Sequence, residues 1–169
     1  FDADRFVLPL LIAAIGIAAS VLGTFLIRTR EEATMGNLLW ALRSGIFGAG
    51  ALVLVGTGIA VWQMDLNFNL FWVVLVGLVV GQVIGTATEY FTSYEYGPTQ
   101  WLSRQALTGP GTVIIGGLGL GMLSTLVPAL AVVVGIWLAN ELAGLYGIAL
   151  AAVGMLSTLG ITLATDAYG

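Results

Sequence analysis

Long apolar runs are the feature that most limits the folds open to this chain. Five of them cover about residues 7–27, 45–62, 70–87, 112–138 and 143–165. A helix rises about 1.5 Å per residue, so about 20 apolar residues are needed to cross the roughly 30 Å hydrocarbon core of a bilayer. The runs lack the alternation of polar and apolar residues that a membrane barrel requires. They therefore predict membrane-spanning helices.

The composition agrees with a chain that lies mostly in lipid. Hydrophobic residues make up 59% of the 169 residues and charged residues only 8%, whereas about a quarter of the residues in an ordinary soluble domain are charged. In lipid every backbone amide and carbonyl needs a partner within the protein, and an α-helix provides these partners within one segment. The sequence therefore predicts an integral membrane protein with an all-α fold, a polytopic transmembrane helical bundle of about five spans.

Glycines and one proline within the spans predict a helix–helix contact and a kink. Gly77, Gly81 and Gly85 recur every four residues, so they share one helix face. Glycine allows the close approach of a neighbouring helix, and this face is predicted to contact a helix rather than lipid. Pro128 lacks an amide hydrogen and its ring clashes with the preceding turn, so a kink is predicted near it.

The connections between the runs carry further predictions. Residues 33–43 have the pattern of a short helix lying along the membrane interface. The stretch 88–110 is polar and aromatic, which is typical of the headgroup layer, so it is predicted to lie outside the hydrocarbon core. Asn140 and Glu141 mark a turn between the last two spans.

Arginine is distributed unevenly among these connections. Arg28, Arg30 and Arg43 lie in the first connection and Arg104 in the third, while the second and fourth have no basic residue. The positive-inside rule then places the first and third connections in the cytoplasm. The four arginines are predicted to lie on one side of the membrane, and Asp166, at the exit of the last run, on the same side.

Two residue types that carry much catalytic chemistry are missing, because the chain has no cysteine and no histidine. Thiolate and imidazole metal sites, disulfides and histidine acid–base chemistry are thereby excluded. The acids near the membrane are Glu89, Glu95, Glu141 and Asp166. Acids in or beside a membrane are functional candidates, but each of these lies near the end of a span, where a carboxylate can reach water. For Glu95 and Glu141 we expect solvation.

Two blocks of the sequence resemble the membrane-bound, ion-translocating inorganic pyrophosphatases. The first block is Gly85-Thr86-Ala87-Thr88-Glu89-Tyr90-Phe91-Thr92-Ser93, followed by Tyr96, Pro98 and Gln100, and then by Thr108-Gly109 and Val113-Ile114. The second block covers residues 146–158 and 166–169. Both blocks have the family's order and spacing, and together they cover about half of the chain. Phe91, Thr99 and the Pro110-Gly111 pair depart from the family's pattern.

The resemblance implies that residues 1–169 are a single transmembrane fragment of a larger enzyme. That enzyme would be an ion-translocating inorganic diphosphatase, a hydrolase and translocase that couples pyrophosphate hydrolysis to proton or sodium transport. The implied partners are pyrophosphate, membrane lipid and a second copy in a homodimer, with no nucleic acid. Magnesium is the implied cofactor, with potassium as a further candidate, and the implied location is a prokaryotic cell membrane. The fragment alone should be inactive.

The resemblance also names site residues. It implies a structural role in the third connection for a set that we call the signature residues: Glu89, Tyr90, Thr92, Ser93, Tyr96, Pro98 and Gln100. No catalytic residue is expected within the fragment. Asp166 is expected at the rim of the pyrophosphate site, where its carboxylate would suit magnesium. The alternative is a solvated carboxylate at a helix end, where the helix dipole is slightly unfavourable.

A different reading of the whole chain stays open at this point. A non-enzymatic polytopic membrane protein, such as a small transporter or a scaffold subunit, would use the same glycine faces for ordinary helix packing.

Overall fold

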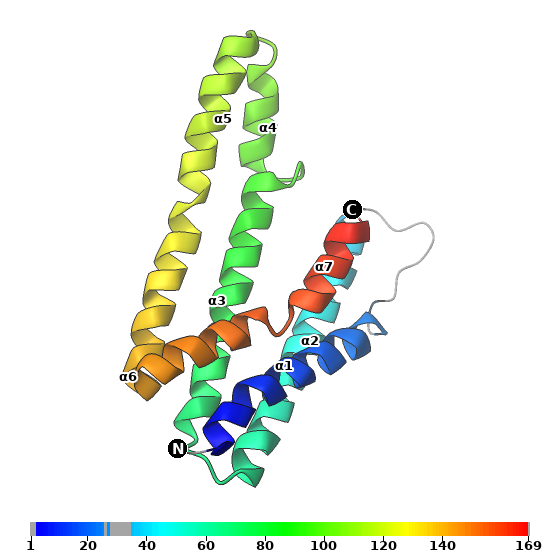
Figure 1. The fold of residues 1–169 in the computed structure, drawn as a ribbon. Helices are drawn as coiled ribbons and strands as arrows, with labels where there is room; N and C mark the ends of the chain where they lie inside the picture. Colours follow the sequence, from blue (N-terminus) through cyan, green and yellow to red (C-terminus); the bar gives the residue numbers. More distant parts are fainter. Residues whose placement is uncertain (1–2, 26, 28–34, 169) are drawn as a thin grey trace. The chain divides into compact units, whose positions relative to one another are not determined.

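The computed structural model describes residues 3–25, 27 and 35–168, with side chains for 5–25, 27 and 40–163 (Figure 1). This part of the chain is helical and contains no strand, which confirms the predicted all-α class. Its helices are α1 (Ala3–Thr24), α2 (Met35–Gln63), α3 (Asn69–Thr92), α4 (Gly97–Gln105), α5 (Pro110–Ser124), α6 (Leu126–Leu156) and α7 (Leu159–Tyr168).

Four helical stretches in the described residues are long and apolar enough to cross a membrane. They are Arg5–Thr24, Trp40–Gln63, Asn69–Gln105 and Pro110–Leu163. The last stretch has 54 residues, more than twice the roughly 20 residues that one crossing needs. Four stretches are therefore compatible with the predicted number of about five spans.

The prediction of a separate interfacial helix over residues 33–43 is wrong for residues 35–43, the part that the structure describes. Helix α2 runs from Met35 to Gln63 as 29 continuous residues, so it joins this segment to the span predicted at 45–62. The Ser44 hydroxyl, at the expected junction, donates to the Ala41 carbonyl at 2.6 Å. No proline separates the two segments, and a hydroxyl bonded back to its own helix leaves the helix intact.

The third connection is more helical than its polar sequence indicates. Helix α3 continues past residue 87 to Thr92, and α4 occupies Gly97–Gln105. The hydroxyls of Thr88 and Thr92 donate to the carbonyls of Ile84 and Thr88 at 2.9 and 2.8 Å. The hydrogen bonds of these hydroxyls are made within α3 itself, so the two threonines are compatible with a continuous helix.

The kink predicted near Pro128 is present as an interruption between α5 and α6. Helix α5 ends at Ser124 and α6 begins at Leu126. Proline cannot donate to the carbonyl four residues before it, which is that of Ser124. The hydroxyls of Ser124 and Thr125 donate to the carbonyls of Gly121 and Met122 at 2.7 and 2.8 Å, which ties the end of α5 together.

The turn predicted at Asn140 and Glu141 lies slightly later in the chain. Both residues are inside α6, and the backbone leaves helical geometry at Ala143 (φ −152°, ψ 21°) and Gly144 (φ 60°, ψ −150°). Glycine is the residue that adopts such a positive φ readily, which fixes the turn here. The span predicted over 143–165 is also not one helix, because α6 ends at Leu156 and α7 begins at Leu159.

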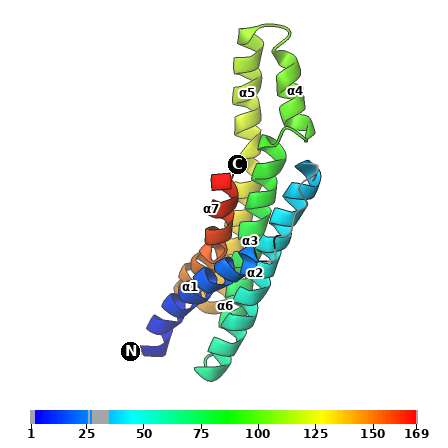
Figure 2. The same ribbon diagram turned by 90° about the vertical axis from the view of Figure 1, so that its right-hand side faces the viewer.

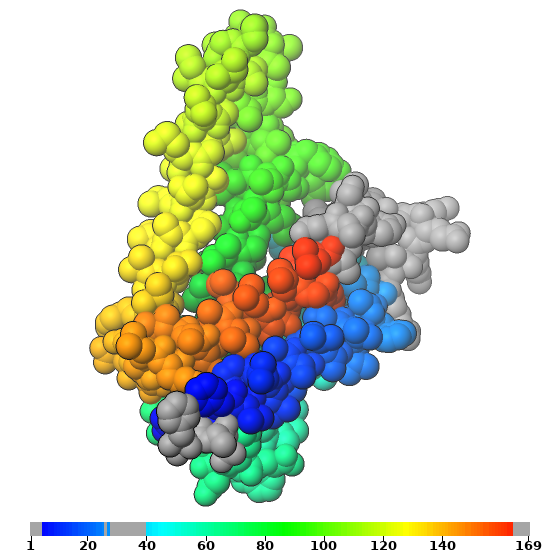
Figure 3. Space-filling model, viewed as in Figure 1, coloured from blue at the N-terminus to red at the C-terminus, as the bar shows by residue number. Residues whose placement is uncertain are grey.

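The described chain divides into two compact units. The first unit comprises Phe1–Val79 and Ile136–Gly169. Within it α1 packs on α2, and α7 contacts both helices (Figure 2). Its core is apolar and includes fully buried side chains from four helices: Leu8, Ile12, Val53, Val73, Val74 and Leu150. Figure 3 shows the atoms of α1 against the segment that leads from α6 into α7.

The second unit, Val80–Gly135, is a more open arrangement. Helix α4 packs on α5, where a Cβ atom at Gly116 would lie 3.3 Å from the ring of Trp101. The side chains of Ile115 and Leu118 are 74% and 67% exposed, and α5 has no buried residue. Such faces suit a helix that lies in lipid or against further helices.

The predicted glycine face on α3 is in contact at only one of its ends. A Cβ atom at Gly77 would collide with the backbone carbonyl of Ala151, and one at Gly154 would lie 2.8 Å from the carbonyl of Val74. Here α3 and α6 meet backbone to backbone, which confirms the prediction for Gly77. At Gly85 a Cβ atom would meet nothing within 4 Å among the described residues.

The predicted sidedness of the arginines stays a prediction. Arg28 and Arg30 lie outside the described residues, and Arg43 and Arg104 belong to different units.

Replacing Gly77 by alanine should destabilise the protein, because the new methyl group has to displace the backbone at Ala151. We expect a loss of about 1–3 kcal/mol, the usual range for overpacking. Gly85→Ala is the matched control on the same helix, and alanine favours helix over glycine by about 1 kcal/mol. Thermal unfolding midpoints in detergent give the comparison, and equal losses for the two variants would contradict the proposed role of the close approach.

Candidate functional site

The signature residues lie together where α3 ends and α4 begins, in the second unit. This corner follows Thr92, the last residue of α3, and leads into α4 at Gly97. Tyr96 precedes α4 in an extended conformation (φ −100°, ψ 155°), and Pro98 lies in the first turn of the helix. Proline is favoured there because the first-turn amides have no partner within the helix. The local sequence therefore sets both sides of the corner.

Side chains of α4 close the corner by binding backbone carbonyls of α3 and of the connection that follows it. The Gln100 amide group donates to the carbonyls of Tyr94 and Glu95 at 3.3 and 3.2 Å. The Thr99 hydroxyl donates to the Phe91 carbonyl at 3.2 Å. Carbonyls at a helix end need external partners, and Thr99 provides one for Phe91. Gln100 holds the connection instead, so both residues have a structural task at this corner.

Aromatic rings pack on the same corner. The ring of Tyr90 lies 5.4 Å from that of Tyr96 and 5.2 Å, edge to face, from that of Phe91. Pairs at this separation contribute beyond their buried area. The side chain of Tyr94 is 62% exposed. The rings of Tyr90 and Tyr96 thus stabilise the corner, and the ring of Tyr94 lies on its surface.

Threonine hydroxyls build the next turn, between α4 and α5. The carbonyl of Gln105 accepts hydrogen bonds from the hydroxyls of Thr108 at 2.7 Å and Thr112 at 3.1 Å. The two hydroxyl oxygens lie 2.7 Å apart. Gly109, between them, has φ 129° and ψ 168°, a region that is almost exclusive to glycine. The Thr108-Gly109 pair therefore forms the turn before Pro110.

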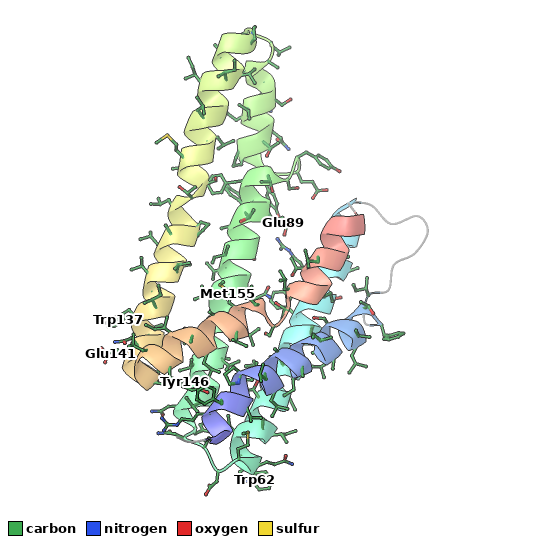
Figure 4. All side chains as sticks on the ribbon, viewed as in Figure 1. Trp62, Glu89, Trp137, Glu141, Tyr146 and Met155 are labelled. Atoms are coloured by element: carbon green, nitrogen blue, oxygen red, sulfur yellow. The ribbon has the colours of Figure 1, made fainter. Side chains whose placement is uncertain are left out.

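The acids are placed differently from one another. Glu95 and Glu141 are exposed, which agrees with the expected solvation, and Figure 4 shows Glu141 at the outer side of α6. Glu89 is half-buried on α3, and its backbone carbonyl accepts the amide of Ser93 at 2.8 Å. The side chain of Asp166 lies outside the described residues, although the backbone of α7 runs through this position.

The described residues do not form a metal centre by themselves. Among them there is no group of three or more Asp, Glu, Cys or His side chains that could hold a metal ion. The signature residues instead bind backbone groups and one another. Their arrangement supports a structural corner, and the roles of the signature residues and of Asp166 in the working protein stay predictions.

Nothing in the sequence assigns a function to the buried hydroxyls of the first unit. Ser157 and Thr158, at the break between α6 and α7, are both 6% exposed. Ser20 is 5% exposed and Thr57 fully buried, and within the described residues the hydroxyl oxygens of these two side chains have no hydrogen-bond partner. The only signal in the sequence is a hydroxyl within an apolar run, which is common in membrane helices.

The helices and the corner define a class, the multi-pass α-helical membrane proteins. The family model described as inorganic H+ pyrophosphatase matches residues 2–169. The chain belongs to this family and is an integral multi-pass membrane protein.

Several relatives carry pump names. A protein of Bacteroides thetaiotaomicron, described as a candidate K(+)-stimulated pyrophosphate-energized sodium pump, is 53% identical over 95% of this chain and 24% of its own length. The K(+)-stimulated pyrophosphate-energized sodium pump of Thermotoga maritima is 48% identical over 56% of the chain and 13% of its own length. The pyrophosphate-energized proton pump 2 of Mycoplana dimorpha is 35% identical over 95% of the chain and 82% of its own length. The chain spans about a quarter of the first of these relatives.

Gly109→Ala should weaken the turn between α4 and α5, because alanine is strained at a φ of 129°. We expect a destabilisation of about 1–3 kcal/mol. Gly111→Ala is the control, since a Cβ atom there would meet nothing within 4 Å among the described residues. Unfolding midpoints of the two variants in detergent test this, and a Gly109→Ala protein as stable as the control would contradict it.

Proposed function

We propose that this chain is part of a membrane pyrophosphatase, an enzyme that couples the hydrolysis of inorganic pyrophosphate to ion transport across the membrane. The observation that carries the proposal is the family match over residues 2–169. The names of the relatives support this reading over the non-enzymatic transporter or scaffold. The complete pump would act as a homodimer in a prokaryotic cell membrane, and this chain alone would be inactive.

Sodium is the transported ion that the relatives support best. Those named as sodium pumps are 53%, 41% and 48% identical to the matched part of this chain. Those named as proton pumps are 35% and 34% identical. The same sodium-pump names include stimulation by K(+), which supports potassium as an activating cation of the complete pump.

Within the pump this chain supplies a helical framework and a cytoplasmic corner. The hydrogen bonds of Gln100 and Thr99 fix the end of α3 against α4, and the turn at Gly109 fixes α4 against α5. Magnesium would screen the charge of pyrophosphate when bound. The described residues contain no group of three or more Asp, Glu, Cys or His side chains that could hold a metal ion. In this proposal other parts of the pump hold the ion, with Asp166 at the rim of that site.

Transport assays on the complete pump test the proposed function. Inverted membrane vesicles that contain it should hydrolyse pyrophosphate and accumulate sodium, with potassium raising the rate. Acidification of the vesicles without sodium uptake would keep the pyrophosphatase but replace sodium by the proton. The absence of pyrophosphate hydrolysis by a folded, membrane-inserted pump would overturn the proposal.

Asp166→Asn should raise the magnesium concentration that supports half-maximal hydrolysis, by about tenfold, because the amide removes one anionic oxygen ligand at the rim. Glu141→Gln is the control, since Glu141 is exposed and should leave the magnesium dependence unchanged. Hydrolysis is measured against magnesium concentration in the complete pump. A wild-type curve for Asp166→Asn would show that Asp166 is a solvated carboxylate.

A further inference from the structure

Helix α7 is a separate segment because the chain breaks just before it. Helix α6 ends at Leu156 and α7 covers Leu159–Tyr168, with Ser157 and Thr158 between them. The amide and the hydroxyl of Ser157 both donate to the carbonyl of Gly154, at 3.2 and 2.6 Å. This spacing of three residues replaces the spacing of four in an α-helix. The axis of α6 therefore does not set the direction of α7.

Helix α1 contacts both the break and the first turn of α7. A Cβ atom at Gly16 would lie 2.6 Å from the backbone oxygen of Ser157, and one at Gly160 would lie 3.0 Å from both Cβ and Oγ of Ser20. Gly16 and Ser20 are four residues apart, so they lie on the same face of α1. Helix α7 also contacts α2, and all of these helices belong to the first unit. The direction of α7 is therefore set by its neighbours, α1 above all.

Ser20 makes its contact by its size rather than by a hydrogen bond. Its side chain is 5% exposed, and its hydroxyl oxygen has no hydrogen-bond partner within the described residues. A buried hydroxyl without a partner lowers stability relative to an apolar group of the same shape. The side chain of Ser20 is instead the surface on which Gly160 packs, and a side chain larger than glycine would fit opposite it only after a shift.

The far end of α7 carries the site residue that the proposed function assigns to this chain. The backbone of α7 runs on from Gly160 through position 166. Six residues of helix rise about 9 Å, so a change of tilt at Gly160 also moves the backbone at Asp166. The proposed function places Asp166 at the rim of the pyrophosphate site. A contact at one end of α7 is thereby linked to a site at its other end.

We propose that Ser20 and Gly160 are positioning residues of the pump. Their contact sets the direction of α7 and thereby the place of Asp166 at the magnesium pyrophosphate site, and neither residue touches the substrate. This inference rests on the proposed function. It adds a residue of α1, distant from Asp166 in the sequence, to the parts of the protein on which the site depends.

Magnesium titrations of the complete pump test the contact. Gly160→Ala should raise the magnesium concentration for half-maximal pyrophosphate hydrolysis by about tenfold, since a misplacement of about 1 Å can cost about a hundredfold in rate. Ser20→Gly together with Gly160→Ala should restore the wild-type value, because it removes both atoms that the new methyl group meets. Gly50→Ala is the matched control, since a Cβ atom there would lie 3.9 Å from the side chain of Thr158, an ordinary contact distance.

A second readout does not depend on turnover. Magnesium with a non-hydrolysable pyrophosphate analogue should raise the unfolding midpoint of the pump, and Gly160→Ala should need about tenfold more magnesium for the same rise. Combining Gly160→Ala with Asp166→Asn should add no further shift, because the glycine variant acts through Asp166. If Gly160→Ala does not fold, Ser20→Thr enlarges the same contact from α1 and should shift both titrations in the same direction.

A lower maximal rate with an unchanged half-maximal magnesium concentration would show that the contact serves stability alone, and would overturn the proposal. Additive shifts of the glycine and aspartate variants, or no rescue by Ser20→Gly, would equally overturn it. The absence of hydrolysis by the wild-type pump would contradict the proposed function itself. Wild-type hydrolysis that neither substitution affects would contradict only the positioning role.

Discussion

The need to pair every backbone amide and carbonyl away from water governs this structure. Long helices meet the need within themselves, but the described chain also breaks or turns at several points. At each of these points a short polar side chain or a close backbone approach is present. Gln100 and Thr99 serve the corner after α3, Thr108 and Thr112 serve the turn before α5, and Asn69 donates to the carbonyl of Leu142 at 3.4 Å beside the turn in α6.

Hydropathy predicted the helical class and the long apolar stretches in which the helices lie, because burial in lipid depends on composition averaged over many residues. It did not predict where helices join or break. Ser44 and Thr88 look like residues of a connection, yet each bonds back to its own helix. The turn at Gly144 depends on a positive φ at one of many glycines. The break after Leu156 lies where the backbone of Ser157 comes close to Gly16 of α1, and such a contact leaves no periodic signal in a single sequence.

For the candidate site, too, the sequence predicted the position of the residues but not their contacts. Resemblance located the signature residues, and their geometry then explains why a glutamine, a proline and aromatic residues stand at this spacing around a corner. Nothing in the sequence alone could assign the acceptors of Gln100, because they are backbone carbonyls rather than side chains. The exposed positions of Glu95 and Glu141 followed from their places at the ends of spans, where a charge reaches water.

The contact between Gly77 and Ala151 has a mechanical consequence. Side chains that interdigitate can exchange rotamers and let two helices slide, but two backbones in direct contact leave no layer that could yield. The first part of α3 and the last part of α6 therefore form one strut within the first unit. A rearrangement of this unit would take place more readily at contacts made by side chains than at this contact between backbones.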